Sequence, residues 1–316
     1  MSLEQYAQFS NYAIASATVV LGLAFLAYLV QWAVARKVAA EPGLVTAGAD
    51  GAVMTEEPAA DDETETRFTM AGSIGYSLTS LAALVLLAGL VTRGLAAERV
   101  PWGNMYEFGC AAVMCALIAY LVLVKVWDID WVGSIITGVG TVVLGASMLV
   151  YVPAGPLVPA LHSYWLVMHV LAAMIAGSAF VIGAAASALF LVKSRAEKRT
   201  PEDARTGMLW RMPSAARMDQ LAYRVNAFAF PVWTFAALIS GPIWAQYAWG
   251  RYWGWDPKEV WAFITWVVYA GYLHARATAG WKGKAAAILC LVGFATFVFN
   301  FVGVNLFVPG LHSYAK

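Results

Sequence analysis

The stretch WAQYAWGRYWGWDPKEVWAFITWVVYAGYLH at residues 244–274 joins an aromatic segment broken by glycines to an apolar segment that ends on a histidine. Asp256 has the position of a helix N-cap, with a proline directly after it and Glu259 three residues on. This is the pattern of a capping box with proline in the first helical position. It predicts a helix that begins after Asp256 and crosses a membrane as far as His274. The aromatic segment is predicted to be a loop, and its tryptophans are Trp249, Trp253 and Trp255.

Two features of this stretch indicate a ligand. An ionisable residue inside a membrane span is functional as a rule, and His274 is such a residue. Tryptophans also anchor proteins at membrane interfaces, but an interfacial belt does not concentrate three of them in one short loop. Broad aromatic faces beside a possible metal ligand suit a flat, apolar molecule that carries a metal. We expect this molecule to be haem.

The composition of the 316-residue chain is that of an integral membrane protein. Hydrophobic residues make up 61% and charged residues 12%, whereas soluble domains carry about a quarter charged residues. Apolar runs of about 20 residues predict about eight transmembrane helices. Their approximate bounds are 11–35, 72–92, 107–125, 131–152, 165–192, 226–246, 259–279 and 285–307. The net charge of +1 argues against a nucleic-acid partner, because no basic surface is left over to neutralise phosphates.

Cationic residues orient the predicted helices. If the spans alternate, the clusters after the first, fifth and seventh spans fall on one side, which the positive-inside rule makes cytoplasmic. These clusters are Arg36 and Lys37; Lys193, Arg195, Lys198 and Arg199; and Arg276, Lys282 and Lys284. Both termini, and the Trp-rich loop between the sixth and seventh helices, are then predicted to lie outside a cytoplasmic membrane. Arg93 and Arg99, after the second span, are exceptions to this pattern.

The chain divides into two parts. Residues 1–100 contain the first spans and a segment at 38–70 that is rich in Asp and Glu and poor in large apolar side chains. Such a composition predicts a disordered, acidic linker, here on the cytoplasmic side. Residues 101–316 are predicted to form the haem-handling part, with the Trp-rich loop at 244–261.

Two of the four histidines are candidate axial ligands of haem iron. His169 is predicted just inside the outer end of the fifth span, and His312 in the external tail. Neutral imidazoles are the usual ligands of this kind. The three tryptophans of the loop would form the wall, with Arg251 as the partner of a haem propionate. His162 receives no role, because a separation of seven residues from His169 is about 10 Å along a helix axis, too far for two ligands of one iron.

Several motifs resemble the WWD signature of haem-handling membrane proteins. The match is to the CcsA/ResC family, named CcsB in some bacteria, of system II cytochrome c biogenesis. The main motif is WGWDPKEVWAFITW, followed by YLH at 272–274. Supporting matches are PWGNMYE at 101–107, LHSYWLVMHV at 161–170, DQLAYR at 219–224 and GVNLFVPGLHSY at 303–314. Together they cover most of residues 101–316.

The resemblance implies a site for haem b. His169 and His312 would be the axial ligands of an external haem, and Asp256 and Trp261 would belong to the same site through the WWD motif. His274 would be one ligand of a second, intramembrane haem position. A ResB-like membrane subunit would supply the opposite ligand of that position.

The resemblance also implies an enzyme, a cytochrome c synthase or haem lyase, that acts as part of a two-subunit complex. It would carry haem to the outer face and present it for thioether attachment to the CxxCH segment of an apocytochrome. Thiol-reducing proteins would be further partners. Two alternatives stay open: a haem exporter or chaperone without ligase activity, and a non-catalytic membrane scaffold. The functions of Glu107 and Arg224, both near span edges, also stay open.

Overall fold

The computed structural model describes residues 1–316 apart from 36–61, 158–160 and 313–316. Regular structure in the described residues is entirely helical, as the sequence predicts. The α-helices are α1 (Leu3–Ala35), α2 (Asp62–Ala97), α3 (Met105–Trp127), α4 (Gly133–Leu149), α5 (Tyr164–Glu197), α6 (Met208–Arg211), α7 (Ala215–Thr234), α8 (Gly241–Trp249), α9 (Pro257–Ala277), α10 (Lys284–Val298) and α11 (Val304–Phe307). Shorter segments are the 3-10 helices η1 (Asp130–Val132) and η3 (Glu202–Ala204) and the π-helices η4 (Phe235–Ser240) and η5 (Phe299–Gly303).

Seven helical stretches in the described residues are long and apolar enough to cross a membrane. Two of them combine several elements: Ala215–Trp249 joins α7, η4 and α8, and Lys284–Phe307 joins α10, η5 and α11. The chain is therefore an all-α, multi-pass membrane protein. α9 is 21 residues long and is the remaining predicted span. Its aromatic and polar side chains make it less apolar than the others, so an eighth crossing stays a prediction.

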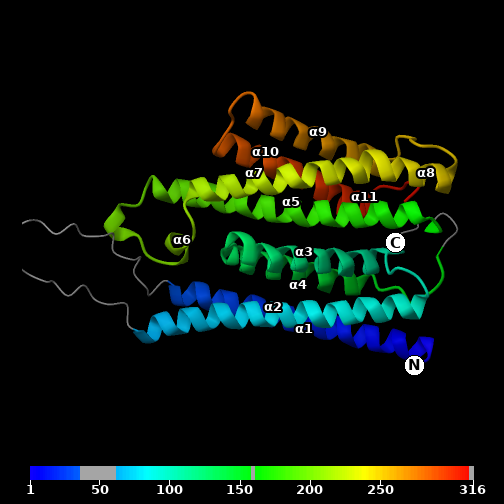
Figure 1. Ribbon diagram of the computed structural model, residues 1–316, viewed down its shortest axis with the longest axis horizontal. Helices are drawn as coiled ribbons and strands as arrows, with labels where there is room; N and C mark the ends of the chain where they lie inside the picture. The colour runs from blue at the N-terminus through cyan, green and yellow to red at the C-terminus, as the bar shows by residue number, and fades with distance from the viewer. Residues whose placement is uncertain (36–61, 158–160, 313–316) are drawn as a thin grey trace, which may run out of the picture.

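The helices lie side by side along the long axis of the molecule (Figure 1). α1 and α2 pair at one edge, α3 and α4 lie next to them, and α5 and α7 follow. α9 and α10 form the opposite edge. α5 is the most enclosed of the spans, and its small residues allow this close packing. A Cβ on Gly177, for example, would lie 2.5 Å from the ring of Phe297.

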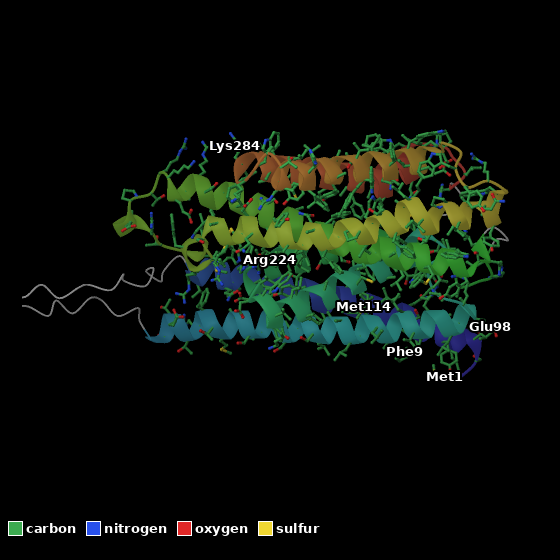
Figure 2. The ribbon with its side chains drawn as sticks, turned by 45° about the horizontal axis from the view of Figure 1, so that its top comes forward. Met1, Phe9, Glu98, Met114, Arg224 and Lys284 are labelled. Atoms are coloured by element: carbon green, nitrogen blue, oxygen red, sulfur yellow. The ribbon has the colours of Figure 1, made fainter. Side chains whose placement is uncertain are left out.

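The two ends of the helix bundle carry different elements. The N-terminus, α8, α11 and the loop between α8 and α9 lie at one end (Figure 1). α6 and the turn from α9 to α10 lie at the other end. Figure 2 shows Lys284 at the end opposite to Met1 and Glu98. We call the end with α8 and α11 the outer end, after the sidedness that the charge pattern predicts.

Arg93 and Arg99, the exceptions in the charge pattern, both bind Glu107 at the outer end. Nε of Arg93 lies 3.0 Å from one carboxylate oxygen of Glu107, and Nη1 of Arg99 lies 2.7 Å from the other. Glu107 also accepts the backbone N–H of Gly103 at 2.8 Å. Glu107 therefore joins the end of α2 to the start of α3. Because the two arginines share this buried anion, they serve the fold locally and are not free to orient the spans.

The predicted acidic linker is shorter than residues 38–70. α2 already begins at Asp62, so the last part of that prediction was wrong. Acidic residues favour the N-terminus of a helix because they complement its dipole. Tertiary contact adds to this: Glu65 pairs with Arg211 of α6 at 2.6 Å, a partner that lies far along the chain. Residues 38–61 of the predicted linker lie outside the described residues.

Candidate functional site

A cavity lies at the outer end between α5, η4, α8, α9 and the chain after α11. Its empty volume is about 1020 Å³, including the part open to solvent, near the upper end of the range for small-molecule sites. Its wall is largely aromatic and includes Trp102, Phe108, Trp233, Trp244, Tyr252 and Phe301. Four residues predicted from the sequence line it: His169, Trp249, Trp253 and His312. The fold thus brings two histidines from distant parts of the chain to one aromatic cavity.

His169 is held by a π-helical turn. Its Nδ1 donates a hydrogen bond to the carbonyl oxygen of Ala236 in η4, at 2.9 Å. η4 ends just before Pro242. Proline lacks an N–H, and in an α-helix its ring clashes with the carbonyl four residues earlier, so the sequence favours a wider turn here. Because a carbonyl oxygen only accepts, His169 carries its proton on Nδ1 and a lone pair on Nε2.

Gly241 makes this approach possible. A Cβ on Gly241 would lie 3.1 Å from Nδ1 of His169 and 2.9 Å from the carbonyl oxygen of Ala236. Both separations are shorter than ordinary van der Waals contacts. A side chain at this position would therefore push the imidazole away from its acceptor, so the glycine helps to position His169.

His312 reaches the cavity from the C-terminal tail and is held by Asp256. Its Nδ1 lies 2.9 Å from Oδ2 of the Asp256 carboxylate, to which it donates. The other carboxylate oxygen accepts the backbone N–H of Leu311 at 2.7 Å. Gly310 lies against the same carboxylate, since a Cβ there would be 2.8 Å from Oδ1. Asp256 therefore fixes both the ring of His312 and the backbone next to it.

The same aspartate begins α9, as the sequence predicts. Asp256 is the N-cap and accepts the N–H of Lys258 at 3.3 Å, and Pro257 follows in the first helical position. Glu259 returns the contact by accepting the N–H of Asp256 at 3.0 Å and that of Gly254 at 2.8 Å. The predicted capping box is confirmed. Asp256 thus both caps α9 and holds His312 at the cavity.

Hydrogen bonding keeps the Asp256 carboxylate ionised. Burial acts to raise the pKa of Asp256, but the hydrogen bonds from His312 and Leu311 outweigh it and lower the pKa to about 2. The pKa of His312 is also lowered, because burial disfavours its charged form more than Asp256 favours it. A neutral imidazole that donates through Nδ1 to a carboxylate has its lone pair on Nε2. Carboxylate–histidine pairs of this kind orient metal-binding imidazoles in many proteins.

Trp244 lies between the two histidines. Its ring is nearly parallel to that of His169, with centroids 5.8 Å apart, and meets the ring of His312 edge-on at 5.6 Å. Trp249 meets His312 edge-on at 5.0 Å and Trp244 at 4.9 Å. Both tryptophans belong to α8, which continues to Trp249. The two imidazoles are therefore buttressed by one pair of indole rings.

The Trp-rich loop is shorter than the predicted 244–261. α8 ends at Trp249 and α9 begins at Pro257, so only the residues between them form the loop, and the wider bounds were wrong. Gly250 ends α8 in a left-handed conformation with φ 74°, which glycine adopts without cost. Trp255 also has a positive φ, 57°, which is strained for a bulky residue.

The remaining predicted site residues lie outside the cavity wall. Trp255 is 65% exposed and packs edge-on against Trp253. Trp261 packs on Phe299, with ring centroids 4.2 Å apart. Arg251 lies against Gly254, where a Cβ would be 0.8 Å from Nη1 of the arginine.

The other two histidines lie away from the cavity. His274 is in the last turn of α9, on the exposed face of that helix. His162 is exposed just before α5 and does not line the cavity. The structure thus separates His274 from the pair formed by His169 and His312, as the sequence predicts.

Sequence reasoning missed several residues of the cavity. Lys258 lines it, and its ammonium donates to Oδ1 of Asn305 at 2.6 Å. Asn300 of η5 and Trp253 each present a buried polar atom, Oδ1 and Nε1, with no hydrogen-bond partner among the described residues. Lys258 lies within the quoted WGWDPKE segment, but the local sequence does not show that its side chain points into the cavity. Asn305 lies within the quoted GVNLFVPGLHSY segment, and Asn300 gave no signal beyond being a polar residue in an apolar span.

These groups fit a haem better than a bare metal ion. The described residues contain no cluster of three or more His, Cys, Asp or Glu side chains that could hold a metal ion. Haem iron needs only two axial ligands from the protein, and the imidazoles of His169 and His312 would be the residues to hold it. The aromatic wall suits the porphyrin faces. The unpaired polar atoms of Trp253 and Asn300 suit a ligand that also carries polar groups.

The chain is similar to known proteins over most of its length. Residues 102–312 match the family described as "Cytochrome C assembly protein". The chain is 36% identical over 257 residues to the cytochrome c biogenesis protein CcsA of Guillardia theta, covering 76% of this chain and 85% of that protein. It is 35% identical to CcsA of Parasynechococcus marenigrum (strain WH8102), covering 75% and 85%. It is 37% identical to CcsA of Chlamydomonas reinhardtii, covering 73% and 65%. The chain therefore belongs to the CcsA family of system II cytochrome c biogenesis.

Proposed function

We propose that this protein is the haem-presenting subunit of a cytochrome c haem lyase. It binds haem b in the outer cavity between His169 and His312 and offers it to the CxxCH segment of an apocytochrome. One observation is the main support for the proposal. Two imidazoles from distant parts of the chain, each with Nδ1 bonded to an acceptor, line one aromatic cavity.

The task of the protein in this reaction is to position the haem and the CxxCH segment. In the attachment reaction each thiol of the CxxCH segment adds across one vinyl group of haem, so a C–S bond forms and the thiol proton ends on carbon. No external oxidant or reductant is consumed in this addition. The histidine of the segment replaces one imidazole of the protein on the iron. Holding the reacting groups in the right geometry supplies much of the acceleration in such reactions.

His169 and His312 differ in how they are held. His169 is part of a long, enclosed helix and bonds to a backbone carbonyl. His312 belongs to the tail after α11 and is held through Asp256. A tail segment moves at lower cost than a packed helix. We therefore assign His312 as the imidazole that the apocytochrome histidine displaces.

The exposed face of α9 supports a second haem position within the membrane. Phe263, Val267, Gly271 and His274 follow one another at helical spacing, and all four are exposed. Gly271 has open space beside it, since an added Cβ would meet nothing within 4 Å. A histidine on an uncovered face suits a ligand shared with another subunit. We assign the opposite ligand to a ResB-like partner, in a two-subunit complex of the cytoplasmic membrane that thiol-reducing proteins would serve.

The visible absorption spectrum of the complex purified in detergent tests the proposal. The wild type should show a low-spin spectrum of haem with two imidazole ligands, which is lost from the outer site in the double variant His169→Ala/His312→Ala. His162→Ala is the matched control, because this histidine is exposed and outside the cavity. A spectrum unchanged by the double substitution would show that haem binds elsewhere. Covalent haem on a co-expressed apocytochrome would distinguish a lyase from a haem chaperone.

A further inference from the structure

Lys258 places an amino group on the wall of the cavity, and the Asp256 carboxylate acts on it only at longer range, without a direct ion pair. It is half-buried in the first turn of α9. Its ammonium donates to Asn305 Oδ1 at 2.6 Å and lies 5.2 Å from the centroid of the Phe301 ring. Within the described residues, no carboxylate lies within ion-pair distance of it. An amino group removed from water is costly to keep charged without a direct counter-ion, so an anion bound in the cavity would stabilise the charged form of Lys258.

The acidic residues next to Lys258 are already committed elsewhere. Asp256 accepts from His312 and from the N–H of Leu311. Glu259 accepts from the backbone N–H groups of Gly254 and Asp256. Both carboxylates therefore hold the loop and the tail in place. A direct counter-ion for Lys258 would therefore be a group that binds in the cavity.

A second, independent observation concerns Trp253. Its indole Nε1 is buried and has no hydrogen-bond partner among the described residues, and its side chain lines the same cavity. An indole N–H is only a donor, so it needs an acceptor. One ammonium and one indole N–H on the same wall are donors that suit a carboxylate oxygen.

We infer that Lys258 and Trp253 form a carboxylate-binding subsite of the cavity. The inference rests on the proposed function: the carboxylate is a propionate of haem. Arg251, the cation that the sequence suggested for this purpose, is not part of the cavity wall and lies against Gly254. The vinyl groups of haem b are on other pyrrole rings than the propionates. Binding a propionate at the start of α9 therefore sets which edge of the ring the apocytochrome meets.

The experiment compares two ligands, ferric haem and its dimethyl ester, in which both carboxylates are blocked. Each is titrated into the complex purified from haem-deficient cells, and the Soret band that depends on His169 and His312 is followed. The wild type should bind haem roughly ten- to a hundredfold more tightly than the ester, as expected for a charge-assisted hydrogen bond. Lys258→Met should lose most of this preference and bind haem nearly as weakly as the wild type binds the ester, because only the N–H of Trp253 remains. The two ligands are compared on the same variant, so an effect of the substitution on folding changes both affinities alike and leaves their ratio unaffected.

Three further variants sharpen the result. Lys258→Arg keeps the cation and should keep the preference for haem. Trp253→Phe keeps an aromatic ring, although a smaller one, but removes the N–H, and should reduce the preference in part. Arg251→Met is the matched control, a neutralised cation of the same loop, and should leave the preference as in the wild type.

The possible failures are distinguishable. Equal binding of haem and ester by the wild type, with a histidine-dependent spectrum, would overturn the carboxylate subsite and leave the proposed function standing. A preference of wild-type size in Lys258→Met, or the loss of the preference in Arg251→Met, would overturn the assignment to Lys258. If neither ligand gave a histidine-dependent spectrum, the proposed function and the subsite would both be wrong.

Discussion

His312 and Asp256 are joined by a hydrogen bond of 2.9 Å between Nδ1 and Oδ2, although they lie 56 residues apart in the chain. The same carboxylate caps α9 and binds the N–H of Leu311. A single aspartate therefore joins the start of a helix to the tail that carries a candidate iron ligand. The tail and the Trp-rich loop are held as one unit for this reason.

Asp256→Asn should separate the two functions of this aspartate. Asparagine is as good an N-cap as aspartate, so thermal stability should change little. The neutral amide orients the imidazole of His312 less firmly, and loss of such a supporting carboxylate typically costs about 10- to 100-fold in metal affinity. Haem occupancy, measured from the Soret band, should fall accordingly. Glu259→Gln is the control, since it alters the capping box without touching His312. Unchanged occupancy in Asp256→Asn would show that the carboxylate does not position His312.

Gly241→Ala should disturb His169 without removing it. The added Cβ would lie 3.1 Å from Nδ1 of His169 and would press on the carbonyl of Ala236. We expect the low-spin haem spectrum to become partly high-spin as the ligand shifts. Gly145→Ala, on α4, is the matched control, because a Cβ there meets nothing within 4 Å. That variant should keep the wild-type spectrum and gain up to about 1 kcal/mol in stability. Identical spectra for the two variants would argue against the positioning of His169 by the π-turn.

His274→Ala should lower haem occupancy at the outer cavity while leaving the fold intact. His274 is exposed on α9, so its removal costs little stability, yet on the proposed route haem passes its position before it reaches His169 and His312. The amount of haem per protein, measured in the complex with the partner subunit, should therefore fall. His162→Ala provides the comparison for an exposed histidine off the route. Normal occupancy in His274→Ala would rule out a route with two positions.

Glu107→Gln should destabilise the fold strongly. The substitution leaves the guanidinium groups of Arg93 and Arg99 without their shared anion, and Arg93 is fully buried. Removing one partner of a buried ion pair typically costs about 3–5 kcal/mol. Glu63→Gln breaks an exposed pair with Arg67 and should cost less than about 1 kcal/mol. Thermal unfolding of both variants in detergent measures the contrast, and equal small shifts would contradict a structural role for Glu107.

Most of the helices could be predicted from local patterns in the sequence. The spans follow from the length of apolar runs, and the start of α9 follows from Asp256, Pro257 and Glu259, whose partners all lie within one helical turn. These features depend on hydrogen bonds and periodicities between near neighbours in the chain, which is why a sequence shows them directly. The start of α2 was placed too late for the opposite reason, because a contact with α6 helps to extend it.

By itself the sequence determined the class of protein and the position of the Trp-rich segment, and it predicted an outer location for His169 and His312. Only the tertiary structure decided which side chains meet. It set Trp244 between the two imidazoles, joined His312 to Asp256, and put Lys258 rather than Arg251 on the cavity wall. The physical reason is that side-chain direction depends on how helices distant in sequence pack together. Packing depends on the fit of whole surfaces, and the local pattern of one helix does not show which side chains of a distant helix will face it.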